Sequence, residues 1–214
     1  ATTLGYDPLI AEVELILGRL RNREGRYPEA EAALRRAYVA ARSAGDGEVA
    51  AAAATELVGV TGNSLARFEA GALWRAVAGA EVARSGDPLA ASDLARETAS
   101  MAVREGDYPR AQADYSRALA LRGAVVGAEH SSLIAELNQL GAVLEKQGKY
   151  AEAGEQIRRA LALCEATLGA EHPLVATTAD NLGAILQAEG RYEDALAQHL
   201  RGLQIRERVL GPDH

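Results

Sequence analysis

The strongest constraint on the fold of this chain is an internal repeat of about 42 residues. The segment GKYAEA at residues 148–153 recurs as GRYEDA at 190–195 and as GDYPRA at 106–111. A further copy, GRYPEA, lies at residues 25–30, and a degenerate one, ARFEAG, at 66–71. A period of this length predicts a chain built from stacked copies of one supersecondary unit. The repeated aromatic residues are Tyr27, Phe68, Tyr108, Tyr150 and Tyr192.

Each copy predicts a pair of helices. Leu174, Leu182 and Leu186 recur at helical spacing, and the helix should end at Gly190, which can adopt the left-handed conformation of a helix terminus. The second helix should begin beside the tyrosine, with Pro28 and Pro109 near its first position. Abundant alanine favours helices, and the absence of long β-branched runs argues against strands.

The start of each first helix shows a capping pattern. Asp7, Asp87 and His172 each precede a proline and are predicted to cap the helix, and Ser131 is the expected cap where proline is missing.

The contacts within each pair are predicted from residue size. Two antiparallel helices approach closely only where small side chains meet, so one alanine per copy is predicted to be a helix contact, with the neighbouring tyrosine filling the volume at the helix turn. These alanines are Ala30, Ala111, Ala153 and Ala195. The second copy departs furthest from the pattern, and we expect its first helix to end near Gly62, with a longer loop to Arg67.

With these motifs the chain resembles a tetratricopeptide repeat (TPR) array, in particular the 42-residue kind found in kinesin light chains and bacterial relatives. The family's Leu-Gly, Gly-x-Tyr-x-x-Ala and Ala-Leu pattern is met by Leu140, Gly141, Gly148, Tyr150, Ala153, Ala160 and Leu161, and its inter-repeat Leu-Gly-x-x-His-Pro by Leu168, Gly169, His172 and Pro173.

This resemblance implies an all-α fold, a right-handed superhelical solenoid of about five antiparallel helix pairs. The expected repeats are about 7–46, 47–86, 87–129, 130–171 and 172–214, in a single array over residues 1–214. Because both ends of the sequence fall at repeat boundaries, we expect a fragment of a longer protein.

Composition excludes several function classes. The net charge of −7 opposes binding to nucleic-acid phosphates. The most apolar stretch, residues 49–60, already contains Glu56, so no membrane span is predicted. Cys164, the single cysteine, cannot form an internal disulfide, which fits a reducing cytoplasm. Abundant alanine and arginine with scarce lysine indicate a GC-rich bacterial source.

Catalysis has little support in the sequence. Cys164 lies in a predicted helix without an adjacent histidine, and His130, His172 and His214 recur at the repeat period in the inter-repeat turn. His199 occupies a position where the family prefers a large packing residue. The glycines form no phosphate-binding motif. We therefore predict no enzymatic activity, no cofactor and no metal site.

The resemblance implies a concave groove lined by the first helices, which would bind a partner protein as a peptide or helix. The groove positions are Arg19, Asn22, Arg23, Arg96, Arg104, Asn138, Glu145, Lys146, Asp180, Asn181 and Gln187. Arg19 and Arg23 lie four residues apart and repel each other, which an acidic partner would relieve, so an extended acidic or mixed peptide is the expected ligand. Similar arrays are attached to bacterial Ser/Thr kinases, so a sensor or docking region of a signalling protein is implied.

Two other functions remain open. The final helix carries Leu200, Leu203 and Val209 toward its outer side, so the array could instead associate with itself through the repeat ends or the convex face. Catalysis is the other open function, with an active site in the irregular second copy.

Overall fold

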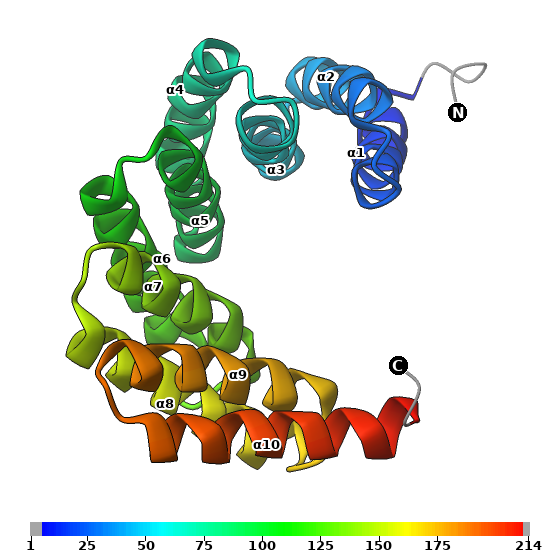
Figure 1. Ribbon diagram of the computed structural model, residues 1–214. Coiled ribbons are helices and arrows are strands. Elements are labelled where there is room, and N and C mark those ends of the chain that lie inside the picture. The colour runs from blue at the N-terminus through cyan, green and yellow to red at the C-terminus, as the bar shows by residue number, and fades with distance from the viewer. Residues whose placement is uncertain (1–5, 212–214) are drawn as a thin grey trace. The chain divides into compact units, whose positions relative to one another are not determined.

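The computed structural model describes residues 6–211, which form helices and turns with no β-strand in that range (Figure 1). This confirms the predicted all-α fold. The α-helices are α1 (Asp7–Arg23), α2 (Tyr27–Ala44), α3 (Gly47–Val58), α4 (Phe68–Ser85), α5 (Pro88–Glu105), α6 (Tyr108–Val126), α7 (Ile134–Lys146), α8 (Tyr150–Leu168), α9 (Pro173–Ala188) and α10 (Tyr192–Leu210). A π-helical turn η1 (Gly59–Ser64) follows α3, and a 3₁₀ turn η2 (Ser131–Leu133) precedes α7.

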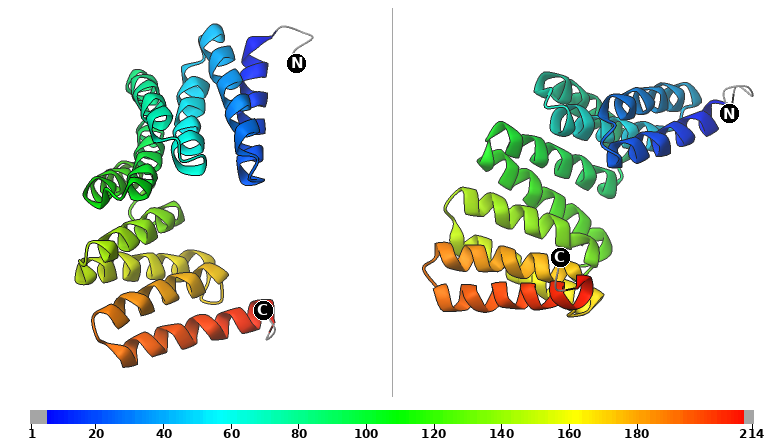
Figure 2. Two further views of the ribbon diagram at one scale, coloured as in Figure 1. Left: turned by 45° about the horizontal axis from the view of Figure 1, so that its top comes forward. Right: turned by 45° about the vertical axis from the view of Figure 1, so that its right-hand side comes forward.

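The chain divides into two compact units, with the division after Leu121 inside α6. Within each unit, neighbouring helices pack as antiparallel pairs. Helices α1 and α2 pair in the first unit, and α7 with α8 and α9 with α10 pair in the second. Both views of Figure 2 show α9 and α10, in orange and red, side by side. The repeat boundaries and the handedness of the superhelix stay predictions.

The helix boundaries follow the repeat. Each second helix begins at the repeated aromatic residue, as predicted, and Gly190 has the left-handed conformation expected at a helix terminus, with a φ of 79°. The Asp87 carboxylate caps α5 by accepting hydrogen bonds from the Leu89 and Ala90 amides at 2.8 and 3.3 Å. His172 caps α9, where its Nδ1 accepts from the Leu174 amide at 3.1 Å.

Two predicted caps are wrong. Asp7 is already the first residue of α1, and the capping position belongs to Tyr6, whose side chain makes no capping bond. Ser131 is the first residue of η2, and the cap is His130, whose Nδ1 accepts from the Ser132 amide at 3.2 Å. An imidazole nitrogen thus replaces the usual carboxylate or hydroxyl acceptor in both inter-repeat turns that contain a described histidine.

The packing within the pairs rests on small residues, as predicted. Ala30, Ala111 and Ala153 are fully buried, and Ala195 is 4% exposed. The repeated tyrosines contribute less than predicted, since Tyr192 is 68% exposed and Tyr150 is 37% exposed. Side chains in a helix tilt toward its N-terminus, so a ring on the first residue points beyond the end of the packed pair.

The second repeat differs most from its prediction. Helix α3 continues directly into the π-helical turn η1, and only three residues, 65–67, connect η1 to α4. The predicted longer loop is therefore wrong. The wider turn keeps the backbone hydrogen-bonded while Gly62 lies against Gly71 of α4, where a Cβ on Gly71 would be 2.9 Å from the Gly62 Cα. Met101 of α5 covers this contact.

Candidate functional site

The first helices of the first unit form a continuous row. Helix α3 contacts both α1 and α5, and a pocket of about 220 Å³ opens along this row. Arg19 and Arg96, two of the predicted groove residues, both line it. Its full lining is Arg19, Glu48, Ala52, Thr55, Glu56, Asp87, Leu89, Ala90, Asp93, Arg96 and Glu97. We refer to it below as the groove pocket.

The charge of the groove pocket is predominantly negative. Five carboxylates line it beside two guanidinium groups. Arg19 Nε donates to Glu56 Oε1 at 2.8 Å, and an Arg96 guanidinium nitrogen lies 2.7 Å from Glu97 Oε1. The repulsion between Arg19 and Arg23, on which the acidic partner was predicted, is thus offset within the chain by Glu56. The remaining carboxylates favour a cationic group on a ligand.

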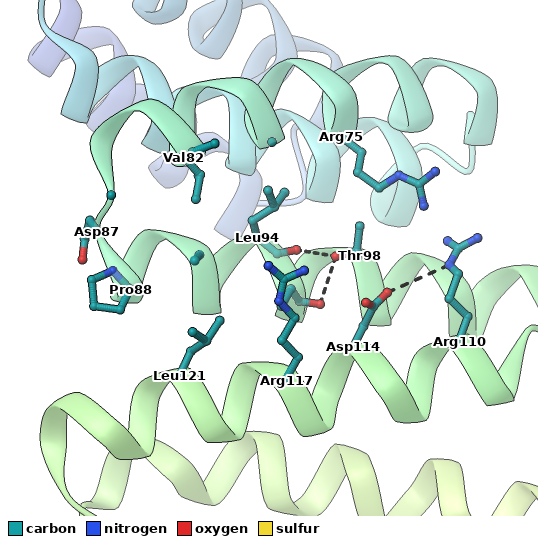
Figure 3. Close-up of a pocket in the computed structure, with 15 residues that line it drawn as sticks. Arg75, Val82, Asp87, Pro88, Leu94, Thr98, Arg110, Asp114, Arg117 and Leu121 are labelled. Carbon is teal, nitrogen blue, oxygen red and sulfur yellow. Dashed lines mark hydrogen bonds and ion pairs between the residues drawn. The ribbon is translucent and has the colours of Figure 1, made fainter.

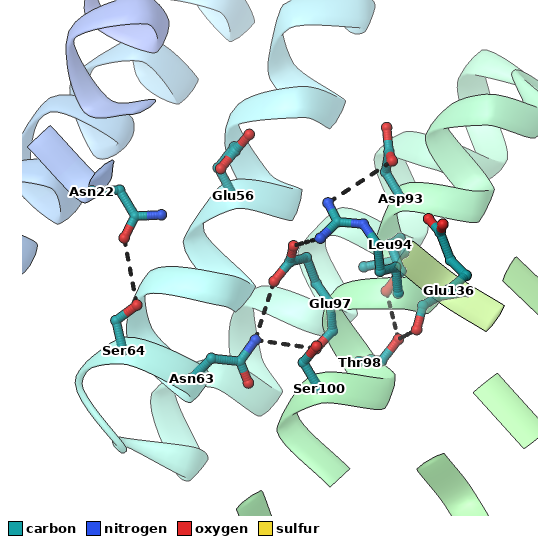
Figure 4. A network of polar contacts seen from close by, with 12 residues as sticks. Asn22, Glu56, Asn63, Ser64, Asp93, Leu94, Glu97, Thr98, Ser100 and Glu136 are labelled. Atoms are coloured by element: carbon teal, nitrogen blue, oxygen red, sulfur yellow. Dashed lines mark hydrogen bonds and ion pairs between the residues drawn. The ribbon is translucent and has the colours of Figure 1, made fainter. Parts of the chain in front are cut away.

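The Glu97 carboxyl of the groove pocket has a perturbed pKa. Burial raises the pKa of Glu97 above its ordinary value; Arg96 and the hydrogen bond from Asn63 lower it, whereas the Glu56 and Asp93 charges raise it further. Asn63 Nδ2 donates to Glu97 Oε2 at 3.1 Å (Figure 4). The π-helical turn η1 carries Asn63 to this position.

The raised pKa predicts a pH-dependent stability. The unfolded Glu97 carboxyl releases its proton near the ordinary value of 4.5, while the folded one retains it to higher pH. The stability that Glu97 contributes is therefore greatest below the unfolded pKa and falls as the pH rises from the unfolded pKa through the folded one. A Glu97→Gln variant lacks the titration, so its free energy of unfolding relative to wild type should increase as the pH rises through this window.

Urea unfolding at a series of pH values measures this difference. Glu152→Gln, which replaces an exposed carboxylate on α8, serves as the control. Its free energy of unfolding relative to wild type should not vary with pH. A difference between Glu97→Gln and wild type that stays constant from acidic to neutral pH would contradict the prediction.

Thr55 supplies an unused donor at the same pocket. Its side-chain oxygen is buried and has no hydrogen-bond partner among the described residues, and the residue is 7% exposed. A buried helical threonine commonly donates to the carbonyl four residues earlier, as Thr61 does to the Leu57 carbonyl at 2.5 Å. A buried hydroxyl without a partner costs about 1–3 kcal/mol, which a polar group of a ligand could recover.

The other predicted residues of the first unit lie at the ends of their helices. Asn22 Oδ1 accepts from the Ser64 hydroxyl at 3.4 Å, so it is tied to the turn η1 (Figure 4). Arg23 and Arg104 are exposed in the last turns of α1 and α5, outside the lining of the groove pocket.

In the second unit, the structure brings two predicted residues together. Asn181 Nδ2 of α9 donates to Asn138 Oδ1 of α7 at 3.0 Å, and Asn138 Nδ2 donates to the Ile134 carbonyl at the same distance.

Asp180, by contrast, is held by α10, with Arg206 at 2.5 Å and His199 Nδ1 at 3.3 Å. Its carboxylate therefore serves the α9–α10 pair. The last three predicted residues, Glu145, Lys146 and Gln187, lie near the ends of α7 and α9.

Sequence reasoning missed the contribution of the second repeat. Thr55 and Glu56 of α3 and Asn63 of η1 all belong to the copy that matches the repeat pattern least, so no groove position was assigned there. The available signal was the polar pair Thr55-Glu56, which directly follows the apolar run of residues 49–54.

The described residues hold no cluster suited to metal binding or nucleophilic chemistry. Within 6–211, no group of three or more His, Cys, Asp or Glu side chains is arranged to hold a metal ion. Cys164 is buried beside Thr178, with 3.7 Å between Sγ and Oγ1, and burial raises the pKa of its thiol, which disfavours the reactive thiolate. His214 lies outside the described residues. None of the described helices is long and apolar enough to span a bilayer.

Comparison with known proteins agrees with this architecture. Residues 132–208 match the family model of the tetratricopeptide repeat. No curated protein sequence matches the chain.

Solved structures of other proteins share the fold. The crystal structure of BtubC (BKLC) from P. vanneervenii superposes with a TM-score of 0.85 at 23% identity, over 98% of this chain and 87% of that one. A putative kinesin light chain with TPR-like repeats from Podosopora anserina gives 0.75 at 18% identity, over 92% and 95%. Pseudomonas aeruginosa pilF gives 0.68 at 16%, over 97% and 87%.

The paired helices and the row of first helices define a helical-repeat solenoid. The family model matches residues 132–208, and over nearly the whole chain the fold is that of a tetratricopeptide repeat array.

Proposed function

We propose that this chain is a non-catalytic protein-interaction scaffold, whose first helices bind an extended peptide of a partner and whose groove pocket receives a basic side chain of that peptide. The observation that supports this most directly is the lining of the groove pocket, with five carboxylates and the unpartnered Thr55 hydroxyl on adjacent first helices. A cationic side chain would offset the excess negative charge, while a peptide carbonyl could accept from Thr55.

Charge at the groove pocket provides the test. Short synthetic peptides that carry Arg, Asp or Ala at one central position are titrated against the chain by fluorescence anisotropy. We expect the Arg peptides to bind most tightly and to lose affinity as salt increases. The double change Glu48→Gln/Asp93→Asn should weaken them roughly 3- to 10-fold, as expected for partly exposed charge pairs.

The matched control is Glu152→Gln/Glu155→Gln, which removes two exposed carboxylates from α8. If the Asp peptides bound more tightly than the Arg peptides, the result would support the acidic partner that the sequence predicts and overturn this proposal. Equal effects of the groove and control variants would also overturn it.

Self-association is the second candidate, favoured by exposed apolar stripes on helices α1 and α10. On α1, Leu9, Val13, Ile16 and Leu20 follow helical spacing and are 41–64% exposed. On α10 the corresponding stripe is Tyr192, Leu196, Leu200 and Leu203, at 46–68%. Sedimentation velocity over a concentration range, with Ile16→Asp and Leu196→Asp variants, separates this function from peptide binding.

We further propose a cytoplasmic, bacterial setting in which the array serves as the docking region of a signalling protein such as a Ser/Thr kinase. The resemblance of the repeats to bacterial arrays supports this setting. Co-purification of a kinase activity with the chain from its native host would test it.

A further inference from the structure

The first unit contains a second and larger pocket, of about 580 Å³, bounded by α4, α5 and α6 (Figure 3). Apart from Asp87, its lining differs from that of the groove pocket. Its volume lies within the range of small-molecule sites, which is about 300–1,000 Å³. We call it the inter-helix pocket.

This pocket arises from one glycine in the repeat. The family's Ala-Leu pair in the second helix reads Ala118-Leu119 in the third copy and Ala160-Leu161 in the fourth, but Ala78-Gly79 in the second. A Cβ on Gly79 would meet no atom within 4 Å, so the space that a large side chain would fill is open.

The preceding helix pair shows what normally fills such a space. Tyr38 stands in the first repeat where Gly79 stands in the second. Its ring packs edge-on against Trp74 of α4, with 5.4 Å between the ring centroids, and so closes the gap between α2 and α4. With Gly79 in that place, the space between α4 and α6 stays open.

The walls of the inter-helix pocket are mainly apolar. Val82 and Ala83 of α4, Leu94 of α5 and Leu121 of α6 line it, and Pro88 lies at its end where α5 begins. Such walls suit the hydrocarbon or aromatic body of a ligand.

Three arginines give the pocket a positive side. Figure 3 shows Arg75 on α4 and Arg110 and Arg117 on α6 around the pocket. Arg110 is 3.0 Å from Glu105 and 4.0 Å from Asp114. Arg75 and Arg117 form no ion pair within 4.0 Å in the described chain, although both lie near enough to Asp114 to lower its pKa against the dominant effect of burial.

We propose that the inter-helix pocket binds a small amphipathic anion, with the apolar body against Val82, Leu94 and Leu121 and the anionic head between Arg75 and Arg117. The geometry carries this assignment: an unfilled apolar space is bordered by two guanidinium groups, those of Arg75 and Arg117, that form no ion pair within 4.0 Å in the described chain. Charge-assisted bonds from guanidinium to a carboxylate, sulfonate or phosphate are the strong kind of hydrogen bond.

A pair of fluorescent probes tests the two halves of the site. 8-Anilinonaphthalene-1-sulfonate carries an apolar ring system and one anionic group, and N-phenyl-1-naphthylamine carries the same rings without the charge. Trp74, the single tryptophan, precedes Arg75 on α4 and can transfer energy to either probe. We expect wild type to bind the sulfonate with quenching of Trp74, and more tightly than the neutral probe.

Two variants separate charge from volume. Arg75→Ala/Arg117→Ala should weaken the sulfonate roughly tenfold or more for each guanidinium lost, and leave the neutral probe unchanged. Gly79→Leu restores the repeat's Ala-Leu pair, fills the pocket and should abolish the Trp74-quenching phase of both probes. Decanoate, a carboxylate on an alkyl chain, should displace the sulfonate from wild type.

The matched control is Arg158→Ala/Arg208→Ala, which removes two exposed guanidinium groups from α8 and α10 and should bind both probes as wild type does. Circular dichroism checks that each variant is folded. Equal weakening of the sulfonate in the two double variants would overturn the proposal, as would unchanged binding to folded Gly79→Leu. Peptide binding at the groove pocket is measured in a separate experiment, so a negative result with the probes would not contradict the proposed function.

Discussion

Replacing Tyr115 with alanine is expected to lower the free energy of unfolding by about 3–5 kcal/mol, the range for removing a buried aromatic side chain. Tyr115 lies on α6 and is 2% exposed, and its hydroxyl is 2.9 Å from the Ser100 hydroxyl of α5. The substitution removes a ring from the packed interior and leaves Ser100 without this partner. Guanidinium chloride unfolding followed by Trp74 fluorescence measures the change in the first unit.

Two further tyrosine variants separate the effect of ring burial from that of the hydrogen bond. Tyr115→Phe keeps the ring and should cost only about 1 kcal/mol, the net value of one hydrogen bond. Tyr192→Ala removes a repeated tyrosine that is 68% exposed and should cost less than about 1 kcal/mol. If Tyr192→Ala destabilised the chain as much as Tyr115→Ala, burial would not be the controlling quantity.

Gly71→Ala is expected to destabilise the chain by about 1–3 kcal/mol, although it restores the alanine found at this position in the other copies. A Cβ on Gly71 would lie 2.9 Å from the Gly62 Cα and 3.1 Å from its nitrogen. These are backbone atoms of η1 and cannot rotate away. The gain in helix propensity, about 1 kcal/mol, is smaller than the cost of separating two packed segments.

Gly79→Ala on the same helix is the matched control. Its Cβ would meet nothing within 4 Å, so only the propensity term acts, and the change should stabilise the chain by about 0.5–1 kcal/mol. Thermal unfolding by circular dichroism compares the two variants. Stabilisation by both would show that η1 moves away from α4 without cost.

The irregular second repeat therefore shapes both candidate sites. The contact of Gly62 with Gly71 accompanies the π-helical turn that carries Asn63 to Glu97 at the groove pocket. Gly79, further along α4, leaves the inter-helix pocket open. Positions that depart from the repeat pattern thus contribute to both candidate sites.

Most of the helical architecture was predictable from the sequence. The repeated aromatic residues mark where each second helix begins, and the small residues that follow are buried in the helix pairs, because periodic spacing and side-chain volume are local properties of the chain. Two of the predicted groove residues, Arg19 and Arg96, line one pocket, and their role in binding stays a prediction.

The balance of charge in that pocket was not predictable. Glu56 pairs with Arg19 across 37 positions of sequence, and nothing local to either residue indicates that partner. The same limit applies to Asp180, which the pattern placed in the groove and which Arg206 of α10 holds instead.

Local sequence patterns were enough to predict that the chain forms helix pairs, where those helices begin and which small residues they bury. Which charges neutralise one another, which tyrosines are buried and where a missing side chain leaves a pocket became clear only once the helices were seen packed together. The physical reason is that helix formation depends on spacing within a few turns, whereas desolvation, ion pairing and cavity volume depend on residues that meet only after the helices have packed.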